Sequence, residues 1–260
     1  MSLHHVDHGG TGPALVLLHA FPLDSGMFDR LVPLLVEDAR VVTIDLPGLG
    51  ESLVPAAAPS MIRAARAVVA VLDDLDIDRA VVLGISTGGY LALELAALVP
   101  GRLAALVLGS TTPWRIEPDE PLDRLEVADD VERRGSTEPV ADSADEGLGA
   151  TAHRDQPELR DELQRTIDAA DPAGVAWMAR AIADRDDTTE ALATFTGPVV
   201  LLFGAEDTAT PATRGEEMLA VRGEGSATTL AVLPHTGHLT PLEAPAEVAE
   251  IVRELLAQLP

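Results

Sequence analysis

Ser86 lies in a short string whose residue types suit a nucleophilic serine. The string, residues 84–88, reads GISTG; it follows an apolar run and precedes a segment with apolar residues at helical spacing. Small residues on both sides of a serine allow a sharp strand-to-helix turn that projects the hydroxyl outward. The first N–H groups of the following helix face the position where an oxyanion would form. Ser86 is therefore the candidate nucleophile, and the alternative is that it only caps the helix.

A serine hydroxyl needs a base, and the base needs a group that orients it. Residues 234–241 follow the last apolar run and contain His235 and His238. We select His238, which follows a glycine and directly precedes the last helix, with His235 as the alternative. Glu206 and Asp207 lie just beyond the preceding apolar run, at the strand end where α/β sheets build their sites. We select Asp207 as the orienting acid, with Glu206 as its competitor.

The three selected residues occur in the chain order nucleophile, acid, base, which is one known solution to this geometry. A tetrahedral oxyanion also needs hydrogen-bond donors. The first apolar run ends in a turn, residues 19–22, that reads HAFP. Pro22 has no N–H, so the sequence favours the backbone N–H of Phe21 as one donor and that of Thr87 as the other. The alternative is that residues 19–22 form only a tight turn.

Short apolar runs that end in Gly, Asp, His or Pro predict the strands that must position these residues. We expect them to be buried on both faces. The runs are Ala14–His19, Val41–Asp45, Ala80–Gly84, Leu103–Gly109, Val199–Phe203 and Thr228–Leu233. Helix-length segments alternate with several of them, as at 61–75 and 88–99, and a last helix is expected at about 246–259, begun by either Pro241 or Pro245. This alternation predicts an α/β fold with a mostly parallel, doubly wound sheet flanked by helices.

Residues 113–190 interrupt the alternation and are polar and helix-forming. They hold 22 acidic residues and 9 arginines, a net charge of −13. We interpret them as a helical cap on a core formed by 1–112 and 191–260, with 135–149 as a mobile loop; a solvated helical excursion explains the charge equally well. Trp114, Trp177 and Met178 are candidates to line a substrate pocket, unless they only pack the cap helices. The acidity of the cap is expected to disfavour anionic substrates.

Composition narrows the possible function classes. The chain has 260 residues, a formal charge of −25 and no cysteine. Such a charge repels a phosphate backbone, so we expect no nucleic-acid partner. The absence of cysteine excludes thiolate chemistry, the histidines form no convincing ligand cluster, and we expect no metal and no cofactor. Without a signal peptide or an apolar run near ~20 residues, we expect a cytoplasmic protein outside the membrane. The sequence leaves a homo-oligomer open.

Taken together, these motifs resemble those of the α/β-hydrolase fold superfamily over essentially the whole chain. Residues 19–22 are similar to its His-Gly oxyanion turn, residues 45–52 to its Asp-x-x-Gly-x-Gly-x-Ser turn, and residues 84–89 to its nucleophile turn. Two departures are Ala20, where glycine is usual, and Pro47 with Leu49, where Arg and His are common. The resemblance implies a small capped serine hydrolase, similar to esterases and 3-oxoadipate enol-lactonases.

The leading hypothesis is hydrolysis of a carboxylic ester or lactone, a small-molecule acyl substrate, through a covalent acyl-enzyme. Four alternatives keep the same fold. In three of them the same residues act in a different enzyme: a C–C hydrolase, a menaquinone-pathway-type lyase or a cofactor-free perhydrolase. The fourth is a non-catalytic small-molecule receptor.

Overall fold

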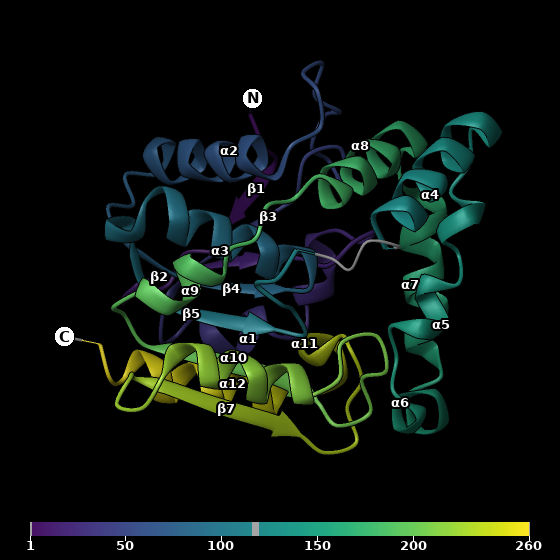
Figure 1. Cartoon of the computed structure of the whole chain (residues 1–260). Coiled ribbons are helices and arrows are strands. Elements are labelled where there is room, and N and C mark those ends of the chain that lie inside the picture. Colours follow the sequence, from purple (N-terminus) through teal and green to yellow (C-terminus); the bar gives the residue numbers. More distant parts are fainter. Residues whose placement is uncertain (1, 116–119, 260) are drawn as a thin grey trace.

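The computed structural model describes residues 2–115 and 120–259, and it contains one seven-stranded sheet. The strand order is β1-β3-β2-β4-β5-β6-β7, with β1 antiparallel to β3 and every other pair parallel. The strands are β1 (His5–Asp7), β2 (Ala14–Leu18), β3 (Arg40–Ile44), β4 (Ala80–Ile85), β5 (Leu103–Gly109), β6 (Val199–Gly204) and β7 (Thr228–Leu233). The predicted α/β fold with a mostly parallel sheet is confirmed (Figure 1).

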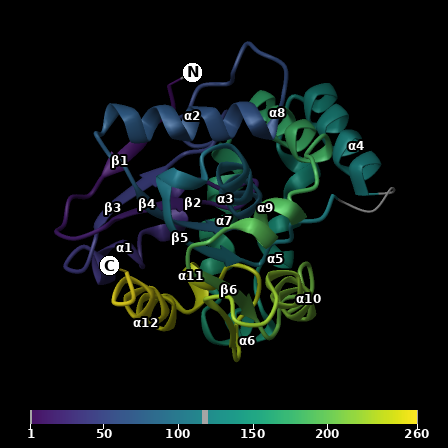
Figure 2. The ribbon, with the colours of Figure 1, turned by 60° about the vertical axis from the view of Figure 1, so that its left-hand side comes forward.

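Helices cover both faces of the sheet (Figure 2). On one face, α1 (Val32–Leu35) contacts α12 (Pro245–Leu256); on the other, α2 (Met61–Asp74), α3 (Thr87–Leu98), α9 (Thr189–Thr194) and α10 (Thr213–Arg222) contact one another in that order. In α2, residues 61, 64, 65, 68, 71 and 72 are all buried, which is the three- and four-residue spacing of a single helix face. The Ser60 hydroxyl caps this helix by accepting the Arg63 N–H at 3.4 Å.

The two edges of the sheet differ from the prediction. The strand β1 was not predicted, because three residues carry too little pattern to distinguish a short edge strand from a loop. The prediction that every strand is buried on both faces is wrong for β7, in which only Leu233 is buried. As an edge strand, β7 has one neighbour and one helix layer, so part of its surface faces solvent. By contrast, β4 and β6 are buried at every residue.

The segment between β5 and β6, residues 110–198, is a largely helical insertion, and Figure 1 shows most of it gathered beyond the carboxyl ends of the strands. Its described helices are α4 (Glu120–Arg134), η3 (Glu138–Val140), α5 (Ser143–Glu146), α6 (Ala150–Asp155), α7 (Glu158–Ala169), α8 (Pro172–Ala183) and α9, which packs on the sheet. Residues 135–149, predicted as a mobile loop, contain the two short helices η3 and α5 and bury Val140, Ala144 and Leu148. Those apolar residues hold a charged segment against its neighbours. The division at residues 113 and 190 stays a prediction.

Each of two prolines begins a helix near the carboxyl end of the chain. Pro241 occupies the first turn of α11 (Thr240–Glu243), and Pro245 begins α12. Proline is favoured there because its missing N–H would have no intrahelical partner. In the described part of the chain, no helix has both the length and the apolar character that crossing a bilayer requires.

Candidate functional site

Ser86 lies on a sharp turn between β4 and α3. Its backbone angles are φ 53° and ψ −112°, and the following helix begins at Thr87. The turn requires close backbone approach. A Cβ atom added to Gly88 would lie 2.0 Å from the Leu18 carbonyl oxygen, and one added to Gly84 would lie 2.2 Å from the Gly88 carbonyl oxygen. Only glycine fits at both positions, so the two glycines of the string that identified Ser86 are a steric requirement of this turn.

His238 and Asp207 form a hydrogen-bonded pair. The distance from His238 Nδ1 to Asp207 Oδ2 is 2.9 Å, and the Asp207 side chain is fully buried. Asp207 Oδ1 accepts the backbone N–H groups of Ala209 and Thr210 at 2.9 and 2.8 Å. Burial raises the pKa of the Asp207 carboxyl, but the hydrogen bond and charge of His238 with the Thr210 N–H outweigh it and hold this pKa below its ordinary value. An ionised Asp207 can orient the ring and stabilise an imidazolium.

Ser86 and His238 line one cavity of about 110 Å³. Its wall comes from the sheet edge, from the 19–22 turn and from the insertion. The described lining residues are Phe21, Pro22, Leu23, Ser86, Thr87, Tyr90, Arg124, Ser143, Glu146, Gly147, Ile182, Ala209, His238 and Leu239. The candidate nucleophile, base and both candidate oxyanion donors therefore share a space of a size suited to a short acyl group.

The turn that contains Phe21 is held by His19, which was predicted to lie in this turn but was assigned no role of its own. His19 is fully buried; Nε2 accepts the Leu46 N–H at 2.8 Å, and Nδ1–H donates to the Ala20 carbonyl at 2.9 Å. Burial lowers the pKa of His19, which keeps it a neutral crosslink between two turns. The Phe21–Pro22 peptide bond is cis. Within the described residues, the N–H groups of Phe21 and Thr87 donate no hydrogen bond, so both can bind an oxyanion.

Glu243 on α11 is a second residue that the sequence analysis missed. Its Oε2 accepts the N–H groups of Gly237 and Gly149, each at 2.9 Å, and its Oε1 accepts the Leu239 N–H at 3.1 Å. Glu243 therefore binds both neighbours of His238 and ties them to the insertion through Gly149. Burial raises the pKa of Glu243 despite these three donors. Nothing in the local sequence identifies it, because its partners are backbone groups.

The competing acid and base lie elsewhere on the same loops. His235 has a side chain that is 77% exposed, and its nearest carboxylate is Glu206, with Nδ1 3.8 Å from Oε1. Glu206 accepts both the N–H and the hydroxyl of Thr151, each at 2.7 Å, which fixes it to α6. Neither residue lines the Ser86 cavity as described.

The three candidate pocket residues do not line the cavity that contains Ser86. Trp177 is buried and donates its indole N–H to the Ala57 carbonyl at 2.9 Å, and Met178 is fully buried in α8. Trp114 lies beside a different cavity, with the guanidinium of Arg214 5.8 Å from its ring centroid. Trp177 and Met178 therefore pack within the fold, which was the alternative to a pocket role, whereas Trp114 lines the other cavity. The lining residues that the insertion contributes are instead Arg124, Ser143, Glu146, Gly147 and Ile182.

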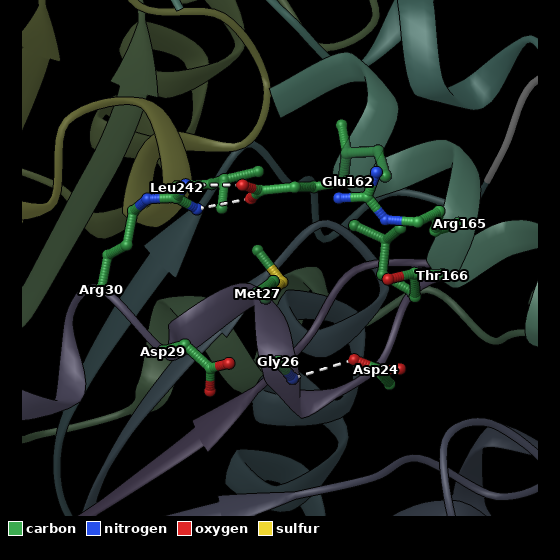
Figure 3. A pocket seen from close by; sticks show the side chains of 11 residues that line it. Asp24, Gly26, Met27, Asp29, Arg30, Glu162, Arg165, Thr166 and Leu242 are labelled. Atoms are coloured by element: carbon green, nitrogen blue, oxygen red, sulfur yellow. Dashed lines mark hydrogen bonds and ion pairs between the residues drawn. The ribbon is translucent and has the colours of Figure 1, made fainter. Parts of the chain in front are cut away.

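A wider cavity of about 580 Å³ lies between η1 (Ser25–Phe28) and α7. Figure 3 shows Arg30 and Glu162 facing each other across it through two hydrogen bonds of 2.8 and 3.0 Å. Asp24 in the same wall accepts the Gly26 N–H. Two of the polar side chains in this wall, Arg30 and Glu162, are thus occupied with each other. Within the described residues, no three acidic or histidine side chains converge to hold a metal ion.

Comparisons with known proteins identify the family. The profile described as "Alpha/beta hydrolase family" matches residues 15–251. A pimeloyl-[acyl-carrier protein] methyl ester esterase from Xanthomonas campestris is 31% identical over 98% of this chain and all of its own length. The dihydrolipoyllysine-residue acetyltransferase component of an acetoin cleaving system from Pseudomonas putida is 28% identical over 92% of this chain, which spans 62% of that protein.

A solved structure agrees with the sequence relatives. A thermophilic esterase from Thermogutta terrifontis, solved with malate bound, superimposes with a TM-score of 0.93 at 31% identity, covering 98% of this chain and 93% of that one. Relatives named as esterases and hydrolases, together with the fold, place this chain among hydrolytic enzymes. The chain belongs to the alpha/beta hydrolase family, as the sequence motifs predicted.

Proposed function

We propose that this enzyme hydrolyses short carboxylic esters or lactones through a Ser86-His238-Asp207 triad and a covalent acyl-enzyme. The observation that carries the proposal is the 2.9 Å pair between His238 and a fully buried Asp207, with His238 sharing one cavity with Ser86. A histidine oriented in this way can take the proton of a serine hydroxyl at neutral pH.

In this mechanism, Ser86 Oγ attacks the substrate carbonyl carbon while His238 Nε2 accepts the hydroxyl proton. The backbone N–H groups of Phe21 and Thr87 stabilise the oxyanion, each by about 3 kcal/mol. The alcohol leaves with the proton from His238, and Ser86 retains the acyl group. Water then attacks the acyl carbonyl carbon while His238 accepts its proton, and the bond to Ser86 Oγ breaks as Oγ takes that proton back, which releases the carboxylic acid. Asp207 stabilises the imidazolium in both steps.

The small size of the cavity that Ser86 lines, about 110 Å³, supports short acyl groups. We therefore expect hydrolysis of p-nitrophenyl esters to be fastest for acetate and butyrate and to fall steeply for octanoate. A profile that rises with chain length would contradict this size limit.

The proposal is tested by steady-state hydrolysis of p-nitrophenyl acetate by wild type and Ser86→Ala. We expect the variant to lose about 10⁶-fold in kcat, because removal of the nucleophile leaves only binding and the oxyanion donors. Ser136→Ala, a serine in the turn after α4, is the matched control and should retain wild-type turnover. Full activity in Ser86→Ala would refute the mechanism. If wild type reacts with a fluorophosphonate at Ser86 but cleaves no ester, C–C bond cleavage by the same residues replaces hydrolysis as the proposal.

A further inference from the structure

One arginine of the insertion faces the Ser86 cavity. Arg124 on α4 is among the lining residues, and its guanidinium carbon lies 5.6 Å from the centroid of the Phe21 ring. This distance is within the range of a cation–π contact. Ser86, Phe21 and Arg124 line the same cavity, so a substrate that reacts at Ser86 can present a second group to Arg124.

Arg124 differs from the other arginines of its helix. Arg133 forms an ion pair with Asp130 at 2.5 Å, and Arg134 forms one with Glu138 at 2.6 Å. Among the side chains that the structure describes, Arg124 has no carboxylate partner and donates no hydrogen bond. In a segment with 22 acidic residues, a half-buried arginine without a carboxylate partner is unusual. Its five N–H donors are available to a ligand in the cavity.

The local charge of this cavity differs from the charge of the whole chain. Arg124 is the one arginine among its described lining residues, and the one acidic lining residue, Glu146, is exposed. A second guanidinium, that of Arg185, lies behind the Tyr90 ring at 4.1 Å from its centroid, but it is not among the described lining residues of the cavity and its charge acts on Glu94 and Asp187. At physiological salt, charges beyond roughly 8 Å are largely screened, so nearby groups dominate over the net −25.

We infer that Arg124 is a specificity-determining residue that binds an ionised carboxylate on the substrate. This inference rests on the proposed function and names its substrate class: compact esters or lactones that carry a second, free carboxylate. The guanidinium carbon lies 5.6 Å from the Phe21 ring centroid, and the guanidinium can bind a carboxylate through two parallel hydrogen bonds. The proposal departs from the expectation that the acidic cap disfavours anionic substrates, because it places a guanidinium at the cavity itself.

The test compares matched substrates that differ only in charge. One pair places the group on the acyl side: the monomethyl ester of glutaric acid and its primary amide analogue. The second pair places it on the alcohol side: acetoxyacetate and acetoxyacetamide. We expect the kcat/KM of wild type to favour the carboxylate over the amide by about 10- to 100-fold in one of the pairs, because a hydrogen bond to a charged group contributes that much. The pair that shows the preference identifies the side on which the carboxylate binds.

Two variants assign the preference to Arg124. In Arg124→Gln the ratio of kcat/KM for the carboxylate substrate to that for its amide should fall to about one, because only the carboxylate substrate loses kcat/KM. Arg124→Lys should keep part of the preference, because lysine supplies a positive charge without the planar fork of donors. The matched control is Arg133→Gln on the same helix, whose arginine is paired at the surface and whose ratio should stay at the wild-type value.

The inference is overturned if wild type shows no preference for the carboxylate in either pair, or if Arg124→Gln keeps the wild-type ratio. Reaction of a fluorophosphonate with Ser86 in each variant separates this failure from that of the proposed function. A labelled Ser86 without carboxylate preference refutes only the substrate class, whereas an unlabelled Ser86 in wild type refutes the triad.

Discussion

Replacement of Glu243 by Gln tests whether this buried carboxylate holds the loop of His238. The amide oxygen can replace Oε2, which accepts two N–H groups, but the NH₂ group then faces the Leu239 N–H that Oε1 accepts at 3.1 Å. One hydrogen bond to a charged acceptor is lost and one buried donor is left unpaired, at a cost of about 1–3 kcal/mol. Removal of a buried charge offsets part of this cost. We expect the free energy of unfolding to fall by about 1–2 kcal/mol.

Urea denaturation followed by circular dichroism measures the change. The midpoint should fall while the m-value stays constant, since the surface exposed on unfolding is unchanged. Glu247→Gln, at an exposed position on the next helix, is the control and should stay within about 0.5 kcal/mol of wild type. If the free energy of unfolding of Glu243→Gln also stays within about 0.5 kcal/mol of wild type, water or a neighbouring group replaces the carboxylate, and Glu243 does not hold the loop of His238.

The pH dependence of this difference provides a second readout. Burial raises the pKa of Glu243 in the folded protein above 4.5, the ordinary value that applies to the unfolded chain. The folded state therefore binds this proton more readily, and the stability it adds is fully present below 4.5 and is lost as the pH rises through the folded-state pKa. Since Gln does not titrate, the advantage of wild type over Glu243→Gln should widen as the pH falls from neutral towards 4.5. An advantage that narrows over this range contradicts the assigned burial.

Two further predictions concern the nucleophile turn and the acid. Asp207→Asn should lower kcat for p-nitrophenyl acetate by about 10⁴-fold with little change in KM, because the amide favours the wrong tautomer of His238; a loss below tenfold would argue for another acid. Gly88→Ala should destabilise the protein by about 3 kcal/mol or more, because its Cβ would lie 2.0 Å from the Leu18 carbonyl oxygen. Gly101→Ala, where a Cβ meets no atom within 4 Å, is the control, and equal thermal midpoints for the two variants would contradict the packing.

The strands and the chemically active loops could be predicted from the sequence because their signals are local. Six apolar runs correspond to β2 through β7, and each carries its own turn residues at its end. The pair of His238 and Asp207 could be anticipated because parallel strands bring their carboxyl ends to one edge. The GISTG string could be recognised because the turn leaves no room for a Cβ at Gly84 or Gly88, so the requirement for glycine is visible in the sequence itself.

Residues that act through the backbone or from the insertion could not be predicted in this way. Glu243 and His19 form hydrogen bonds with backbone N–H and carbonyl groups. Almost every residue carries such groups, so no pattern of residue types identifies the partners. The choice of Trp177 as a pocket residue followed from its size alone, whereas its position was decided by packing and by the Ala57 carbonyl. Arg124 is one of nine arginines in the insertion, and only the fold distinguishes it from those paired at the surface.

The most direct test of the central claim is the mass of the protein during turnover. Wild type mixed with p-nitrophenyl acetate and quenched in acid within the first turnovers should carry one acetyl group, and peptide fragmentation should assign it to Ser86. Ser86→Ala treated in the same way should carry none. An acetyl group on another residue, or hydrolysis of the ester by wild type with no adduct at any quench time and no burst of p-nitrophenol, would contradict a covalent mechanism at Ser86.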